Sequence, residues 1–179
     1  MASTTAVGEL FELGDRTMAT LRPIRQDAAE ALVRFHGRLS CRSVTLRYFY
    51  PHLALQPAEV AHLTEVDGRD RAALVVARDG ELIAVGRYDR LDDPTQAEVA
   101  FVVADAFQHH GIATMLLHRL AARARKAGIR CLIAEVLVEN KAMLAVFHAT
   151  GYPTESTVEC GTVELKMAIG PDNHTLSAT

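Results

Sequence analysis

The residues whose types and spacing suggest chemistry lie near the middle of the chain. Glu98 precedes an apolar, valine-rich run, Val99–Val103, which predicts a buried strand. Beyond a polar segment, Gly111 and Ala113 open an apolar pattern at helical spacing that ends at Gly128. Because the first amides of a helix have no internal partners, a strand, a loop of small residues and a helix in this order predict a site for an anion such as phosphate.

The spacing Gln108-x-x-Gly111-x-Ala113 narrows the kind of anion site. It lacks the second pair of glycines of the dinucleotide fingerprint, and no Gly-Lys-Ser/Thr sequence is present to form a P-loop. From the spacing alone two interpretations stay open. Either the loop binds a phosphate, or it is a helix N-terminus that consists of small residues and binds nothing.

A second segment of interest begins at Asn140. An apolar helical pattern follows it and ends at Phe147, with Gly151-Tyr152 just beyond. The two segments, in this order and a short strand apart, resemble the acetyl-CoA motifs of the GNAT acetyltransferase superfamily, over roughly residues 20–170. Four further stretches resemble the bacterial protein-lysine acetyltransferases that modify acyl-CoA synthetases: Leu39-Ser40-x-x-Ser43, Leu46–Phe49, Leu63-Thr64-x-Val66-Asp67 and Ala97–Phe101.

The resemblance implies a fold and a co-substrate. The fold is α/β (α+β), a single GNAT-like domain with a mixed sheet of six to seven strands, splayed at the cofactor site and flanked by helices. Acetyl-CoA is the co-substrate, and its pantetheine arm lies between the splayed strands. The residues that the resemblance places around it are Phe101, Val102, Val103, Gln108, His109, His110, Gly111, Ile112, Ala113, Thr114, Asn140, Met143 and Phe147.

Several of these residues have a simpler interpretation. Asn140 is among the best residues for capping a helix N-terminus, and that role is compatible with a cofactor contact. His109 and His110 either meet phosphate when protonated or are exposed loop histidines. Phe147 stands where many family members have a Tyr that protonates the leaving thiolate. Phe cannot do so, and either water donates that proton or the thiolate leaves unassisted, since a thiol pKa of about 8.5 makes it a tolerable leaving group.

Glu98 is the candidate general base. Alternation along the strand places Glu98, Ala100 and Val102 on one face and Val99, Phe101 and Val103 on the other. A lysine ammonium has a pKa of about 10.4 and must lose a proton before it attacks a thioester. The matching glutamate is the base in the acetyltransferases that this chain resembles, and a strand amide of the Phe101–Val103 segment would stabilise the oxyanion. The alternative is a solvated carboxylate at a strand start.

Composition sets wider limits. The chain has 179 residues, 49% hydrophobic and 23% charged, with a net charge of −3, which suits one domain and does not suggest a nucleic-acid-binding protein. No apolar run is long enough to span a membrane and no signal peptide is evident, so a cytoplasmic protein is expected. The three cysteines and eight histidines show no metal-ligand spacing, and the cysteines are expected to be small buried residues.

Periodicity predicts the remaining elements. Residues 1–19 show no periodicity and are expected to form a partly ordered arm. Residues 20–170 are expected to form the domain, and residues 171–179 a loose tail. The expected strands are residues 20–24, 71–77, 82–88, 98–103, 131–137, 155–159 and 162–169. The expected helices begin near Asp27, Ser40, Pro57, Ile112 and Asn140. Because a helix joins them, the strands at Glu98 and Cys131 should run parallel.

The sequence therefore predicts an acetyl-CoA-dependent N-acetyltransferase that acts on a protein lysine, with an acyl-CoA synthetase as the implied acceptor. Two alternatives remain at this stage: acetylation of a small amine or amino acid, and an acyl-CoA-sensing module without turnover. A monomer and a homodimer are both compatible with the sequence, and neither a nucleic-acid nor a membrane partner is expected.

Overall fold

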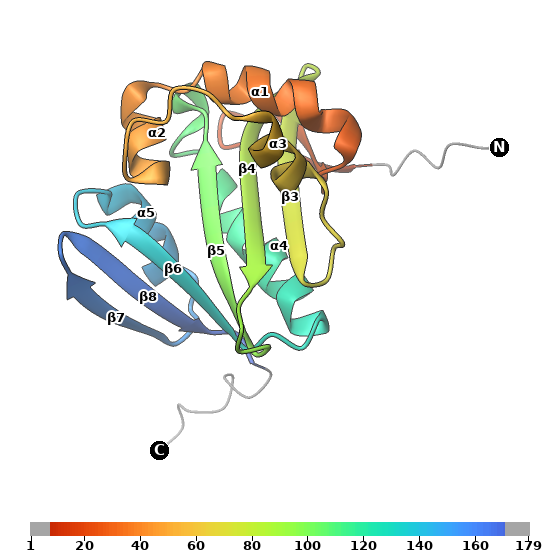
Figure 1. Ribbon diagram of the computed structural model, residues 1–179. Helices are drawn as coiled ribbons and strands as arrows, with labels where there is room; N and C mark the ends of the chain where they lie inside the picture. The colour runs from red at the N-terminus through yellow and green to blue at the C-terminus, as the bar shows by residue number, and fades with distance from the viewer. Residues whose placement is uncertain (1–7, 171–179) are drawn as a thin grey trace.

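A computed structural model describes residues 8–170, in which eight strands form one mixed sheet flanked by five α-helices (Figure 1). The strands are β1 Glu9–Glu12, β2 Met18–Pro23, β3 Arg71–Arg78, β4 Glu81–Arg90, β5 Gln96–Val103, β6 Cys131–Leu137, β7 Thr154–Glu159 and β8 Thr162–Ala168. The helices are α1 Ala29–Gly37, α2 Cys41–Tyr48, α3 Pro57–Thr64, α4 Ile112–Lys126 and α5 Lys141–His148. Short 3-10 helices at Gln26–Ala28 and Asp105–Phe107 precede α1 and α4.

The sheet has the strand order β1-β2-β3-β4-β5-β6-β8-β7. Neighbouring strands are antiparallel except β5 and β6, which are joined through α4 and run parallel, as predicted. The single mixed domain implied by the family resemblance is thus confirmed, with one strand more than the upper estimate.

The helices cover the sheet on both faces. Helix α4 packs on β3, β4 and β5 from one side, with α5 beside it, whereas α1, α2 and α3 lie on the other side (Figure 1). Two hydrophobic clusters correspond to these layers. The larger contains the α4 stripe Leu116, Leu117 and Leu120 with Val99 and Phe101 of β5. The smaller joins Leu32 and Phe35 of α1 to β3 and β4, through Ala73, Val75, Leu82 and Val85.

One glycine permits the close approach of two central strands to α4. Gly86 of β4 lies opposite Phe101 of β5, and a Cβ atom at Gly86 would come within 2.8 Å of the Phe101 ring and 3.2 Å of Leu120. Any larger residue at this position would push the aromatic ring or the helix away. The packing of Phe101 therefore depends on the absence of a side chain on the neighbouring strand.

The structure corrects two expectations. Residues 1–19 were expected to form a partly ordered arm without a regular element, but strand β1 lies within them and pairs with β2 from Glu9↔Leu21 to Glu12↔Met18. Cys41 and Cys160 are exposed rather than buried, and only Cys131 is partly buried. The predicted loose tail, 171–179, lies outside the described residues, as do residues 1–7.

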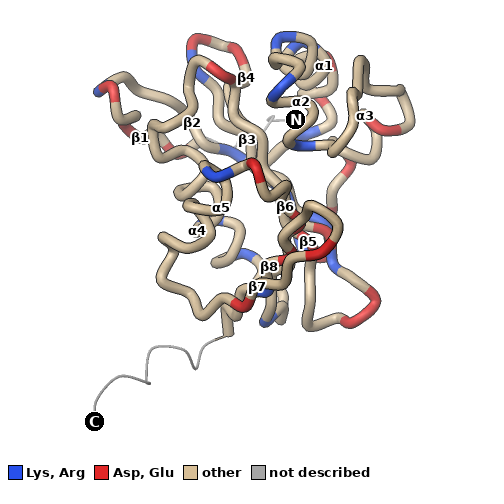
Figure 2. Tube along the Cα trace, turned by 90° about the vertical axis from the view of Figure 1, so that its left-hand side faces the viewer, with Lys and Arg blue, Asp and Glu red and all other residues tan. Residues whose placement is uncertain are grey.

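The described chain carries no membrane-spanning helix, since none between residues 8 and 170 combines the necessary length with sufficient apolar character. Over the same residues, no three His, Cys, Asp or Glu side chains are grouped so that they could hold a metal ion. Figure 2 shows Lys and Arg interspersed with Asp and Glu along the chain.

Candidate active site

The site is organised by the separation of β5 and β6. These strands pair over only three positions, from Gln96↔Cys131 to Glu98↔Ile133, and then diverge toward α2 and α5 (Figure 1). Ala104 donates its amide to Ile83 of β4, so the even-numbered residues of β5 bond to β4. The amides of Phe101 and Val103 consequently point into the gap on the β6 side, where an extended ligand could bond to them.

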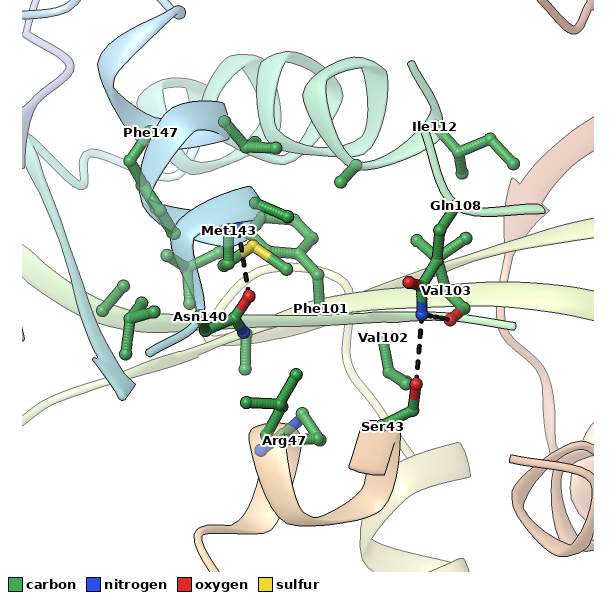
Figure 3. Close-up of a pocket in the computed structure, with 18 of the residues that line it drawn as sticks. Ser43, Arg47, Phe101, Val102, Val103, Gln108, Ile112, Asn140, Met143 and Phe147 are labelled. Atoms are coloured by element: carbon green, nitrogen blue, oxygen red, sulfur yellow. Dashed lines mark hydrogen bonds between the residues drawn. The ribbon is translucent and has the colours of Figure 1, made fainter. Parts of the chain in front are cut away.

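A cavity of about 480 Å³ occupies this gap. It is lined by β5, the loop after it, the first turn of α4, the middle of β6, α5 and α2. Figure 3 shows α5 and α4 on one side of β5, and α2 on the other. The sequence-predicted residues that line the cavity are Glu98, Phe101, Val102, Val103, Gln108, His109, Gly111, Ile112, Ala113, Thr114, Asn140, Met143 and Phe147.

His110 is the one predicted residue that does not line the cavity. It lies against Gly14, in the turn between β1 and β2, and its Nδ1 atom is buried without a hydrogen-bond partner. The expectation that His110 meets phosphate therefore has no support from its position. His109 does line the cavity and is exposed, with a left-handed backbone conformation at φ 64°.

The N-terminus of α4 faces this cavity with free amides. Gly111 is the N-cap residue at φ 79°, a left-handed conformation that favours glycine, and it offers no side-chain cap. The first helical bond runs from the Met115 amide to the Gly111 carbonyl. The amides of Ile112, Ala113 and Thr114 precede it, and no acidic residue lies in the first turn. This end of the helix has the donors and the dipole to hold a diphosphate.

Gln108 connects the loop to α2. Its Nε2 atom donates to the Val103 carbonyl at 3.2 Å and to Ser43 Oγ at 3.1 Å (Figure 3). The Ser43 hydroxyl donates in turn to Asp105 Oδ1 at 2.8 Å, and the Ser40 amide and hydroxyl also donate to Asp105. Because both groups that face the amide nitrogen act as acceptors, the orientation of the Gln108 amide is determined.

Asp105 is the acceptor on which this network ends. Burial alone would raise the pKa of Asp105, but the hydrogen bonds from Ser40 and Ser43 outweigh burial, and the pKa lies below its ordinary value. Ser40 is also the N-cap of α2, since its Oγ accepts from the Ser43 amide at 3.1 Å. Three residues on two distant segments thus attach α2 to the loop that precedes α4.

Helix α5 forms the opposite wall. The Asn140 side chain accepts a hydrogen bond from the Met143 amide at 3.1 Å, so it caps α5, as its simpler interpretation predicted (Figure 3). Phe147 is 1% exposed, and its ring lies 6.0 Å from that of Phe101, centroid to centroid. Cys131 does not line the cavity, and burial raises the pKa of its thiol, so it is a poor nucleophile.

Glu98 lies on the other face of β5, toward the helices α1, α2 and α3. Its neighbours Val99 and Phe101 are buried under α4, whereas Glu98 itself is exposed, and this matches the predicted alternation. The Glu98 side chain is therefore not withdrawn from water. It lines the cavity at the last paired position before β5 and β6 separate.

Charged residues that were not predicted surround Glu98 on this face. Asp89 of β4 lies directly opposite it, and Arg87 is a second β4 residue on the same face. Arg87, with 8% of its side chain exposed, donates Nε to Asp89 Oδ2 at 2.8 Å and Nη2 to Oδ1 at 2.7 Å. Arg71 of β3 adds a bond from Nε to Asp89 Oδ1 at 3.2 Å.

His62 of α3 stands next to this ion-pair cluster. Its Nε2 atom lies 3.3 Å from Arg87 Nη2, and burial and the charges of Arg71 and Arg87 lower the pKa of His62. The lowered pKa favours the neutral imidazole, and Asp89 Oδ1 lies 3.8 Å from His62 Nε2. Alternation along two strands of known register could have revealed the cluster, but the register comes only from the fold.

Comparison with known proteins agrees with this geometry. Residues 39–152 match the Acetyltransferase (GNAT) family, and the chain therefore belongs to that family. Its co-substrate is acetyl-CoA, which the free amides of α4 and of β5 suit.

Three proteins of known name are similar to this chain. The crystal structure of the GNAT domain of S. lividans PAT superimposes with a TM-score of 0.85, at 38% identity over 93% of this chain and 99% of that one. An acetyltransferase of Pseudomonas aeruginosa is 30% identical over 154 residues, 81% of this chain and 83% of that protein. Acetyltransferase Pat of Mycolicibacterium smegmatis is 33% identical over 135 residues, 73% of this chain, and the match spans 40% of Pat.

Proposed function

We propose that this protein transfers the acetyl group of acetyl-CoA directly to the ε-amino group of a lysine in another protein, such as an acyl-CoA synthetase, with Glu98 as the general base. The observation that carries the proposal is the position of Glu98, an exposed carboxylate at the point where β5 and β6 separate. The similarity to S. lividans PAT, together with the motifs shared with bacterial protein-lysine acetyltransferases, supports a protein acceptor.

The reaction requires one base and no covalent enzyme intermediate. Glu98 accepts a proton from the lysine ammonium, and the free amine attacks the thioester carbon to form the new C–N bond. The oxyanion of the tetrahedral intermediate meets the strand amides of Phe101 or Val103. The nitrogen of the intermediate loses its second proton to water, the C–S bond breaks, and CoA leaves as a thiolate. Solvent protonates the thiolate, because the buried Phe147 has no hydroxyl to donate.

We call the face of β5 that carries Glu98 the acceptor face. The segment that follows α2, on this face, suits a macromolecule. Phe49, which lines the cavity, Tyr50 and Leu53 are exposed in the segment that follows α2, and Leu53 is 91% exposed. Large apolar side chains left in water favour contact with a protein surface. A small amine would leave these side chains uncovered, so they support a protein acceptor over a small-molecule acceptor.

The base assignment is tested with a matched pair of variants. Glu98→Gln should lower kcat about 100-fold or more while leaving the acetyl-CoA dissociation constant unchanged, because only the proton acceptor is lost. Glu135→Gln is the control, since Glu135 is an exposed carboxylate of β6 that lines the same cavity. Stopped-flow measurement of thiol release gives kcat, and calorimetry gives the dissociation constant of acetyl-CoA. Equal turnover of the Glu98→Gln variant and the wild type would refute the assignment.

The acceptor is identified separately. Radiolabelled acetyl-CoA is incubated with the wild-type protein and candidate acyl-CoA synthetases, and labelled peptides are mapped by mass spectrometry. We expect label on a single lysine of an acceptor protein, and none when Glu98→Gln replaces the wild type. Label that appears only in small metabolites of a lysate would assign the enzyme to small-molecule acetylation instead.

A further inference from the structure

Arg47 is a positive charge without a counter-ion in the cavity wall. It is a half-buried residue of α2 that lines the cavity together with Glu98. Its guanidinium lies over the ring of Tyr48, 5.0 Å from Cζ to the ring centroid. Between residues 8 and 170 it forms neither a hydrogen bond nor an ion pair. A cation that is partly removed from water, and forms no ion pair with a carboxylate, favours an anion from outside the chain.

The position of Arg47 indicates which ligand supplies that anion. Arg47 lies on the α2 side of β5, and Phe147 lies on the α5 side (Figure 3). The α4 N-terminus, which suits the diphosphate, is part of the helix packed on the same face as Phe101 and Phe147. The diphosphate of acetyl-CoA is therefore matched by the α4 N-terminus on one face of β5, while Arg47 is on the acceptor face.

The neighbouring charges leave Arg47 as the unmatched one. Arg87 and Arg71 both bind Asp89, and the charge of Asp89 is thereby occupied. Burial lowers the pKa of Arg47, Arg87 adds to this effect, and Tyr48, Glu98 and Asp89 act in the opposite direction. Glu98 is thus within electrostatic reach of Arg47 without forming an ion pair with it. In the proposed reaction Glu98 accepts the proton of the amine and loses its negative charge, so it cannot also neutralise Arg47.

We propose that Arg47 binds a carboxylate of the acceptor beside the reactive amine, so that the acceptor site recognises a positive and a negative group together. The inference rests on the proposed function, because it deepens the description of the acceptor. In a protein acceptor the carboxylate belongs to an Asp or Glu side chain near the target lysine. In a small acceptor the same chemistry would come from the α-carboxylate of a free amino acid.

The test compares two sets of peptides that differ only in the residues flanking one lysine, Glu in the first set and Gln in the second. The wild-type protein should show a kcat/KM about tenfold higher for the Glu peptides, as expected for a charge-assisted hydrogen bond. Arg47→Gln should remove this preference with unchanged acetyl-CoA affinity, and Arg47→Lys should retain part of it. Arg42→Gln, an exposed arginine on the same helix, is the control and should keep the preference.

Different outcomes separate the two proposals. Equal kcat/KM for Glu and Gln peptides in the wild type, or a preference that survives in Arg47→Gln, would overturn the role of Arg47 and leave lysine acetylation intact. Free amino acids and their amides form a second arm of the experiment. Turnover confined to free amino acids, and lost in Arg47→Gln, would overturn the protein-lysine function while supporting the carboxylate site.

Discussion

The two faces of β5 are built by different physical means. On the donor face Val99, Phe101 and Val103 are buried under α4 and α5, and apolar packing determines the geometry. On the acceptor face Arg71 of β3 and Arg87 and Asp89 of β4 are held together by ion pairs and hydrogen bonds. Glu98 of β5 and Arg47 of α2 line the cavity on the same face. One strand thus separates a dry, closely packed half of the site from a polar, open half.

This difference has a consequence for how each half can change. A donor site made of main-chain amides and packed apolar side chains binds the same acetyl-CoA whatever the acceptor is. An acceptor site made of side chains from separate segments can change its charge pattern by substitution without altering the cofactor site. The comparison predicts that the donor half is sensitive to lost volume and the acceptor half to lost charge.

The largest effect is expected on the donor side. Phe147→Ala should lower the free energy of unfolding by about 3–5 kcal/mol, because it leaves a cavity against the Phe101 ring in the main core. Chemical denaturation measures the loss. Val158→Ala, on the exposed strand β7, should change stability by less than about 0.5 kcal/mol. Losses of similar size in both variants would mean that packing around Phe147 does not hold this half together.

The next largest effect is expected in the ion-pair cluster of the acceptor side. Asp89→Asn should destabilise the fold by about 2 kcal/mol, since it leaves the buried Arg87 guanidinium without its anion. This figure lies below that for a fully buried pair because Asp89 keeps 32% of its side chain exposed. Asp92→Asn, in the exposed turn that follows, is the control and should be nearly neutral. An equally small effect in both would show that Arg87 is adequately solvated.

The two halves also differ in how much the sequence could predict. The cofactor loop, the α4 N-terminus and Phe147 were identified because their residues lie in two short, continuous segments with recognisable spacing. The Ser43–Asp105 bond joins residues 62 positions apart, and the Arg71–Asp89 bond depends on the pairing of β3 with β4. No local pattern encodes such contacts. Strand β1 was missed for another reason, because its four residues are too few to show a period.

A smaller effect is expected at Gly111, where the donor side depends on backbone conformation. Gly111→Ala places a side chain at φ 79° and should cost about 1–2 kcal/mol of local strain, so that the α4 amides are displaced and the KM for acetyl-CoA rises. Gly80→Ala is the matched control, since Gly80 has φ 81° in the β3–β4 turn, again with open space around the added Cβ. It should lose similar stability with an unchanged KM. A rise in KM for both variants would point to general destabilisation.

The smallest effect is expected for Asp105, where the two halves meet. Asp105→Asn should weaken the attachment of α2 by less than about 1 kcal/mol, since Asp105 is largely exposed and its bonds are screened by water. Because hydrogen bonds hold its folded-state pKa below the unfolded value, its contribution to stability is complete above about pH 4 and is lost as pH falls through the folded-state pKa. The stability difference between wild type and Asp105→Asn should therefore shrink on acidification below pH 4.

A double-mutant cycle with Ser43→Ala distinguishes this network from general damage. If Ser43 and Asp105 act through their shared bond, the double variant should lose less stability than the sum of the two single variants. The KM for the acceptor should rise a few-fold in each single variant, because α2 carries Arg47 and the acceptor wall, while acetyl-CoA affinity should change less. Additive losses of stability, or equal changes in the KM for the acceptor and in the acetyl-CoA affinity, would show that α2 and the cofactor loop are positioned independently. The geometry of the acceptor half would then depend on the ion pairs alone.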